Sequence, residues 1–341
     1  MTPWPVREGV FELGDWPTER GGVIRSARLA WQTHGTLNAA RDNVIVYPTS
    51  YTATHDGQSW AIGPDSILDP ERYFIVIPDM FSNGLSSGAA NTPDYPAVVT
   101  LRDNVLAQER LLREVFGVTH LAAAYGFSMG AMQAYHWAAL FPERVQRAFV
   151  VCGSARTAPH NRVFLSGLLR TLEAAPEYIG NGQFSAVPHA TLRAFGHIYA
   201  GWGLSQDFYR QDLFRTVLGA PDLETYLQTD WEASFAARDA ANLYAQALTW
   251  FHGDISANAL YGGDLAAALG AIQARVLLLP GETDLYFRVA DNAAERAHLK
   301  HGELNPIPSV WGHRAGSPAG LPQELAFLKG AVRGALATES P

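Results

Sequence analysis

The sequence predicts an α/β fold in which a mostly parallel, doubly wound sheet carries an inserted helical cap. Short β-rich runs alternate with longer helical patterns along most of the 341 residues, which is typical of a sheet with helices on both faces. One predicted strand leads through a serine flanked by glycines directly into a predicted helix. From about 155 to 265 the alternation stops, and the chain becomes mainly helical and rich in aromatic residues.

The part of the chain before the cap contains strands and helices in turn. The run at 73–78, YFIVIP, is almost entirely apolar, as expected of a strand buried on both faces. The segment 99–117 has leucines and a phenylalanine at helical spacing and ends at a glycine. The predicted strands are 25–35, 43–48, 73–78, 120–125 and 147–153, and the predicted helices are 99–117 and 128–142.

After the cap the alternation returns. We predict a strand at 275–281, a helix around 289–300, a strand near 304–311 and a last helix from about 321. The expected domain organisation is therefore a core formed by 1–154 and 266–341, with 155–265 inserted as the cap.

Composition excludes several classes of protein. A hydrophobic content of 48% suffices for a large core, and the net charge of −8 without a basic run argues against nucleic acid as a partner. The N-terminal residues lack the pattern of a signal peptide, and no apolar run is long enough for a membrane span. Cys152 is the single cysteine, which fits a reducing compartment. A cytoplasmic protein without a membrane partner is the expectation.

The pattern G-x-S-x-G occurs twice, around Ser86 and around Ser128. A nucleophilic serine of this type needs a strand before it and a helix after it, because the strained turn between them exposes the hydroxyl. The strand HLAAAY precedes Ser128 and a strong helical pattern follows it, whereas ANTPDYP after Ser86 does not begin a helix. We therefore predict Ser128 as the nucleophile and Ser86 as a loop serine.

A nucleophilic serine also needs donors for the oxyanion of the intermediate. The backbone N–H of Met129, at the start of the helix, is one candidate. The second is expected in the loop TSYTATH, which follows the strand 43–48, at Ser50 or a close neighbour. Tyr51 of the same loop is a candidate substrate contact. The alternative for this loop is an ordinary polar surface loop.

The general base and its carboxylate partner should follow the nucleophile in the order acid, then histidine. Asp284 lies just past the strand 275–281, at the end where active sites of such sheets form, and Glu282 is its competitor. Of the three later histidines, His298 and His301 end a helical pattern and look solvated. His313 lies between glycines in the segment SVWGHRAGSP after the last strand. We predict Ser128, Asp284 and His313 as a catalytic triad.

These residues and several longer segments resemble the homoserine O-acetyltransferase family of the α/β-hydrolase fold, and in particular its esterase branch. The resemblance implies the same triad positions, a helical cap over the site, and a homodimer joined through the cap. The segments that carry it are LAWQTHGTLN, LDPERYFIVIPDMFSNGLSS, LRDNVLAQERLL, GFSMGAMQAYHWA, RAFGHIYAGWGLS, GETDLYF and GHRAG.

The chain also departs from that family. Its acetyltransferases hold the carboxylate of homoserine with an arginine on the first cap helix, and the amine with an aspartate after the catalytic histidine. Here Leu169 falls at the arginine position, with Arg170 beside it on another face of the helix, and Arg314 follows His313. A zwitterion would be poorly compensated in such a site, while an uncharged ester would not.

The sequence therefore predicts a serine esterase that hydrolyses short-chain, acetate-type esters, with a small-molecule ester as its partner and no metal or cofactor required. An acyltransferase that uses an acyl-CoA remains an alternative, with homoserine or another acceptor, because the chemistry of the triad is the same. A non-catalytic scaffold is the third alternative, although it would have no reason to keep all three triad residues in their contexts.

Overall fold

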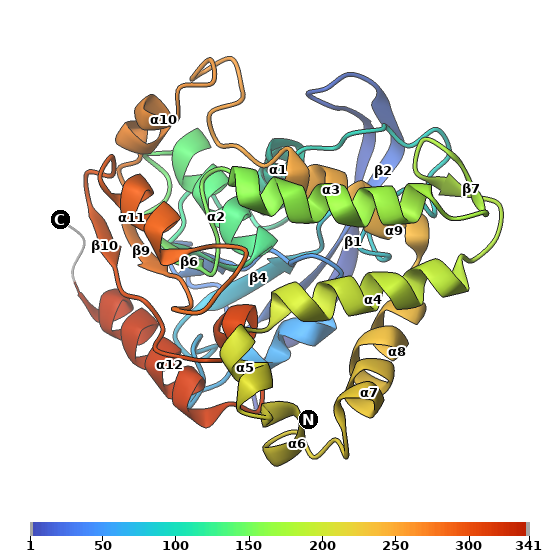
Figure 1. Cartoon of the computed structure of the whole chain (residues 1–341). Coiled ribbons are helices and arrows are strands. Elements are labelled where there is room, and N and C mark those ends of the chain that lie inside the picture. The colour runs from blue at the N-terminus through green and yellow to red at the C-terminus, as the bar shows by residue number, and fades with distance from the viewer. Residues whose placement is uncertain (1–2, 339–341) are drawn as a thin grey trace.

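The computed structural model describes residues 3–338. Its centre is an eight-stranded sheet in the order β1-β2-β4-β3-β5-β6-β9-β10. From β4 to β10 all neighbouring strands are parallel, while β1, β2 and β4 pair antiparallel (Figure 1). The strands are β1 (Val6–Pro17), β2 (Val23–His34), β3 (Val44–Val46), β4 (Phe74–Pro78), β5 (Ala123–Phe127), β6 (Arg147–Val151), β9 (Arg275–Leu279) and β10 (Gly302–Leu304).

Alternate residues of the strands feed two separate cores, one on each face of the sheet. In β9, Val276 and Leu278 belong to the core that contains Ala134 of helix α2, whereas Leu277 belongs to the core that contains Leu328 of α12. This two-sided burial is the reason the parallel strands are apolar at nearly every position. The helices around the sheet are α1 (Leu101–Val115), α2 (Met129–Leu140), α10 (Leu265–Ala271), α11 (Val289–Arg296) and α12 (Pro322–Ala337), with 3₁₀ turns η1 (His55–Ala61) and η3 (Gly312–Gly316).

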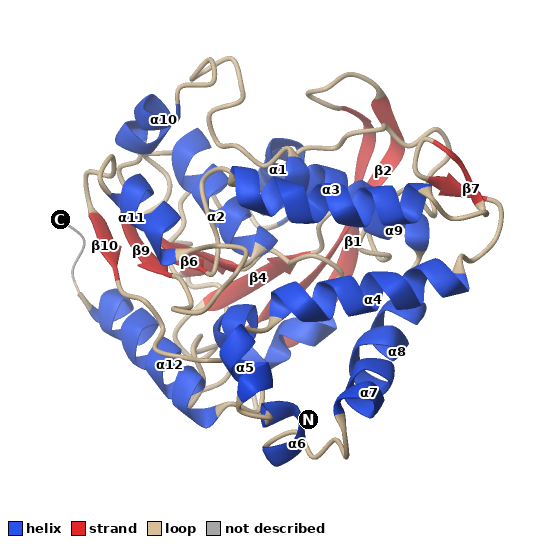
Figure 2. Ribbon diagram, viewed as in Figure 1, coloured by secondary structure: helices blue, strands red, loops and turns tan. Residues whose placement is uncertain are grey.

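Between β6 and α10 the regular structure is helical except for one short hairpin (Figure 2). The long helices α3 and α4 pack against each other, and α3 also packs against α9. One two-stranded hairpin, β7–β8, interrupts the helices. The elements of this segment are α3 (Pro159–Glu173), β7 (Tyr178–Gly180), β8 (Gln183–Phe184), α4 (His189–Gly203), α5 (Gln206–Arg210), α6 (Leu213–Thr216), α7 (Leu223–Tyr226), the π-helical turn η2 (Leu227–Glu232), α8 (Ala233–Ala236) and α9 (Ala240–Phe251).

Two features differ from the sequence prediction. The strand expected near 304–311 is β10, which ends at Leu304. Pro306 and Pro308 have no N–H to donate to a neighbouring strand, so the chain continues as a loop. At the other edge, β1 and β2 form a long antiparallel ribbon whose first strand the sequence reading did not include. Within residues 3–338, none of the helices is both long and apolar enough to cross a membrane.

Candidate active site

Ser128 lies at the sharp turn between β5 and α2, as predicted. Its backbone has φ 56° and ψ −126°, a strained conformation for a residue with a side chain. The turn is held on both sides: Ser128 N–H donates to Val151 O at 2.9 Å, and Ser128 O accepts from Ala131 N–H at 2.9 Å. The strain is thus balanced by neighbouring strand and helix, and it lifts the hydroxyl out of the sheet.

The two glycines of the turn are required by close backbone approaches. A Cβ on Gly126 would lie 2.1 Å from Gly130 O, and a Cβ on Gly130 would lie 2.5 Å from Pro48 O. Both are far inside van der Waals contact, so no side chain fits at either position. The pattern G-x-S-x-G at this place is therefore a packing requirement of the turn.

Asp284, His313 and Ser128 form one hydrogen-bonded chain although they lie far apart in sequence. His313 Nε2 is 2.9 Å from Ser128 Oγ, and His313 Nδ1 is 2.7 Å from Asp284 Oδ2. With the imidazole neutral, Nδ1–H donates to the carboxylate, and Nε2 is left to accept the serine proton. The other carboxylate oxygen accepts from the N–H groups of Tyr286 and Phe287, at 2.7 and 3.2 Å, so the carboxylate is fixed in place.

Aromatic rings surround the imidazole. The ring centroid of His313 lies 4.6 Å from that of Phe127, 4.9 Å from that of Tyr286 and 5.6 Å from that of Phe287. Ser128, Asp284 and His313 are all buried, with 3%, 4% and 8% of their surface exposed. An apolar, nearly closed surrounding strengthens the electrostatic interactions of the triad and limits the access of bulk water.

Cys152 is a neighbour of the triad that the sequence reading treated only as an isolated thiol. It follows β6, and its Sγ lies with the ligand atoms of Asp284 and His313 in one group within 4.8 Å. Burial raises the pKa of the Cys152 thiol well above its ordinary value, which keeps it protonated and a poor metal ligand. Because Asp284 and His313 already bond each other, this group suits proton transfer better than metal binding.

The predicted oxyanion donors lie beside the nucleophile. Met129 begins α2, and Ser50 approaches the turn closely, since its Oγ donates to Phe127 O at 2.5 Å. Within residues 3–338, the backbone N–H groups of Met129, Ser50 and Tyr51 donate to no acceptor. None of the three is therefore used inside the described fold, and Tyr51 is a candidate donor equal to Ser50.

The competing residues of the sequence reading lie elsewhere. Ser86 is fully buried in a loop, where its Oγ donates to Asp79 O at 2.7 Å and accepts from Ala30 N–H at 2.9 Å. Glu282 is exposed, as are His298 and His301. None of these side chains is part of the hydrogen-bonded chain at Ser128.

The three proposed substrate contacts have different surroundings. Leu169 on α3 and Tyr51 belong to one buried apolar cluster that also includes Met129. Arg170, which follows Leu169 on α3, is exposed over 77% of its side chain and pairs with Glu173. Arg314 is half-buried, and its guanidinium carbon lies 5.2 Å from the ring centroid of Trp311.

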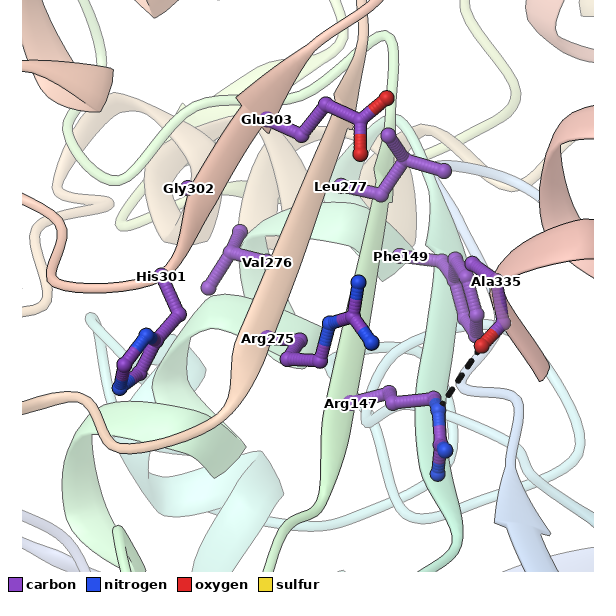
Figure 3. Close-up of a pocket in the computed structure, with 9 residues that line it drawn as sticks. All are labelled: Arg147, Phe149, Arg275, Val276, Leu277, His301, Gly302, Glu303 and Ala335. Carbon is purple, nitrogen blue, oxygen red and sulfur yellow. Dashed lines mark hydrogen bonds between the residues drawn. The ribbon is translucent and has the colours of Figure 1, made fainter. Parts of the chain in front are cut away.

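A separate cavity lies where β6 and β9 begin, at the other end of these strands from the triad (Figure 3). It measures about 370 Å³ and is lined by the first residues of β6 and β9, Arg147 and Arg275, and by His301. Arg147 donates to Ala335 O at 3.0 Å and also to Thr338 O. Its charge therefore serves the C-terminal end of α12, where carbonyl groups lack helical partners.

Comparison with known protein families and structures places this geometry among ester hydrolases. A family described as alpha/beta hydrolase fold matches residues 43–309. A relative from Corynebacterium glutamicum, named as a probable esterase, is 40% identical over 321 residues, which cover 90% of each chain. The ethyl acetate hydrolase of Pseudomonas veronii is 35% identical over 316 residues, 89% of each chain.

Similarity extends to solved structures and to acyltransferases. The structure of the acetyl esterase MekB superposes with a TM-score of 0.92 at 32% identity and covers 97% of each chain. The homoserine O-succinyltransferase of Methylibium petroleiphilum is 32% identical over 313 residues, 80% of this chain and 78% of its own.

Proposed function

Because this chain belongs to the α/β hydrolase fold family and is a carboxylic ester hydrolase within it, we propose that it hydrolyses short-chain, acetate-type esters through an acyl-enzyme on Ser128. The resemblance to the esterase branch of the homoserine O-acetyltransferase family is confirmed by its relatives. The observation that carries the proposal is the hydrogen-bonded chain from Asp284 through His313 to Ser128 Oγ.

In the first step His313 Nε2 takes the proton of Ser128 as Oγ attacks the ester carbonyl carbon. The carbonyl oxygen becomes an oxyanion, which the N–H of Met129 and that of Ser50 or Tyr51 stabilise. Asp284 holds the imidazole in the correct tautomer and stabilises its positive charge. The intermediate collapses, the alcohol leaves with the proton from His313, and an acyl ester remains on Ser128.

In the second step water replaces the alcohol. His313 takes a proton from water as its oxygen attacks the acyl carbon, and the same donors hold the second oxyanion. Collapse of this intermediate releases the carboxylic acid and returns the proton to Ser128. The chain of residues needs no further group to complete this cycle.

The surroundings favour an uncharged substrate. Leu169 is buried in the apolar cluster, and Arg170 lies outside it in an exposed ion pair with Glu173. The first cap helix therefore offers no cation for a substrate carboxylate at these two positions. Arg314 would repel an ammonium group where the acetyltransferases use an aspartate. An acetate of a simple alcohol carries neither charge and loses nothing from these residues.

Steady-state kinetics on purified protein tests the proposal. We expect kcat/KM for small acetate esters, such as ethyl acetate, to exceed that for acetyl-CoA with homoserine by about a thousandfold or more, since each of the two missing charge partners costs about 2–3 kcal/mol. The matched comparison is the same ester with a butyryl or longer acyl group. Faster acetylation of homoserine than hydrolysis would replace the proposal by the acyltransferase alternative.

We also propose that residues 155–265 act as a cap and join two copies of the chain as a homodimer in the cytoplasm. In support of the dimer, this segment exposes large apolar side chains at Val163 (66%), Ile179 (66%) and Val187 (53%), which a protein interface would cover. A solution mass of one chain at micromolar concentration would contradict the dimer. The cytoplasmic location rests on the single, buried cysteine.

A further inference from the structure

The loop after β3, residues 49–55, contains a backbone conformation that its residue types disfavour. Thr52 has φ 62°, in the left-handed region, where a β-branched side chain crowds the backbone. Ala53 N–H donates to Ser50 O at 3.0 Å, so Tyr51 and Thr52 form the centre of a tight turn. A strained turn of this kind persists only where the surrounding contacts hold it.

Contacts from the cap hold this turn. Gln246 Oε1 accepts from Thr52 N–H at 2.8 Å, and Arg238 Nη1 donates to Thr52 O at 2.6 Å. Tyr51 Oη donates to Leu243 O at 3.0 Å. Leu243 and Gln246 are on α9, and Arg238 comes just before that helix. Both sides of the strained residue are thus bonded to one region of the cap.

The side chain of Gln246 is itself fixed. It is 1% exposed, and its Nε2 donates to Phe81 O of the core at 3.3 Å. On the core side of the loop, Ser50 Oγ bonds Phe127 O and Thr49 O accepts from Gln133 of α2 at 2.9 Å. The N–H groups of Ser50 and Tyr51, which have no acceptor among the described residues, therefore belong to a segment held on both sides. Ser50 Oγ bonds the turn of the nucleophile, and Tyr51 Oη bonds the cap.

We propose that Gln246, supported by Arg238, is a positioning residue for the oxyanion hole. By holding Thr52 in the left-handed conformation, it sets the orientation of the preceding peptide groups, which carry the donors for the substrate oxygen. The inference rests on the proposed function, because such donors matter only for acyl chemistry. The role belongs to the side chains of Gln246 and Arg238, which bond Thr52 directly, and not to α9 as a whole.

Steady-state kinetics of Gln246→Leu on a small acetate ester tests the inference. Leucine keeps the volume but accepts no hydrogen bond, so the N–H of Thr52 loses its acceptor. We expect kcat to fall about 10–100-fold, somewhat less than removal of a donor itself would cause, with KM changed less than about threefold. The control is Thr249→Val, one turn further along α9, which removes a buried cap-to-core hydrogen bond from Oγ1 to Val99 O of 2.6 Å. Its kcat should stay within about twofold.

Variants of Arg238 provide a second test that does not depend on a buried substitution. Because Arg238 is exposed, its replacement should leave the fold intact. Arg238→Met should lower kcat about 3–10-fold, while Arg238→Lys, which keeps a donor for Thr52 O, should keep more than half of it. Equal kcat losses in Gln246→Leu and Thr249→Val, or a loss confined to KM, would overturn the inference. Wild-type protein that hydrolyses no ester would instead overturn the proposed function. Active wild type with unaffected Gln246 and Arg238 variants would refute only the positioning role.

Discussion

Two segments of this chain share the pattern G-x-S-x-G and have opposite roles in the fold. Ser128 has a strained backbone, stands at the N-cap position of α2 without a side-chain cap, and bonds the imidazole of His313. Ser86 lies in a loop and uses its hydroxyl to join β2 to the chain after β4. The pattern of glycines is the same, so it does not decide the role. The helix that begins at once after Ser128 decides it, because only there can a strained turn present the hydroxyl.

The test with the largest expected effect replaces each of the two serines by alanine in a separate variant. Ser128→Ala should lower ester hydrolysis about a millionfold, since the nucleophile is lost, and Ser86→Ala should keep most of it. Activity of purified, folded variants against ethyl acetate measures both. Similar losses from the two substitutions would mean that the comparison assigns the wrong roles.

The next test concerns Asp284, the carboxylate that bonds the histidine at Ser128 and has no counterpart at Ser86 in the described part of the chain. Asp284→Asn should lower kcat about ten-thousandfold with little change in KM, because an amide favours the wrong tautomer of His313. Glu282→Gln is the matched control, since Glu282 is exposed and two residues away. If the control lost as much kcat as Asp284→Asn, the carboxylate would have been misassigned.

A third test compares the first glycines of the two segments. Gly126→Ala places a Cβ 2.1 Å from Gly130 O, a backbone atom that cannot move without opening the turn. We expect a loss of several kcal/mol of unfolding free energy, or no folded protein. A Cβ on Gly84 meets nothing within 4 Å, and only its φ of 102° opposes a side chain, so Gly84→Ala should cost about 1–2 kcal/mol. Chemical denaturation distinguishes them, and similar costs would argue against a packing requirement at Gly126.

A fourth test concerns α2, the helix that follows Ser128 and has no counterpart after Ser86, and measures how stability depends on pH. Tyr135 of α2 donates to Glu295 Oε2 at 3.1 Å, and Ala155 N–H donates to Oε1 at 2.8 Å. Burial raises the pKa of Glu295 from 4.5 to about 8. Between the two pKa values the carboxyl of Glu295 is protonated in the folded state and ionised in the unfolded state. Its contribution to the free energy of unfolding therefore falls as pH rises from 4.5 to the folded pKa, by about 1.4 kcal/mol per pH unit.

Glu295→Gln should remove this dependence. Its unfolding free energy, measured by denaturant titration from pH 5 to 8, should vary less with pH than that of the wild type. Glu303→Gln is the control, because Glu303 is exposed on β10 and should leave the profile unchanged. Parallel profiles for Glu295→Gln and wild type would show that the buried carboxyl is ionised throughout.

The smallest expected effect is on stability, where Ser86 should matter more than Ser128, the reverse of their effects on activity. Ser86→Ala leaves Asp79 O and Ala30 N–H without their partner and should cost about 1–3 kcal/mol of unfolding free energy. Ser128→Ala should change that free energy by less than about 0.5 kcal/mol, because the hydroxyl serves chemistry rather than folding. A larger destabilisation at position 128 than at 86 would contradict this division.

Much of the core and the triad could be predicted from local patterns. The strand, turn and helix around Ser128 lie within about twenty consecutive residues, and Asp284 and His313 follow strands or glycine turns that the sequence marks clearly. The strand expected near 304–311 was wrong in its extent, because two prolines interrupt it after Leu304. Arg170 was predicted to lie on another face of the helix from Leu169, because one residue along a helix turns a side chain by about 100°.

The sequence by itself determined the fold class, and it marked Ser128, Asp284 and His313 as candidate triad residues, because the strands and glycines that mark each of them are local features of the chain. Tertiary structure alone decided the surroundings. Thr52 meets Arg238 across 186 residues and Gln246 across 194, and Cys152 meets Asp284 across the end of two strands. Such contacts depend on how the cap returns to the sheet, and no local pattern of a polar side chain reveals which distant backbone group it will bond.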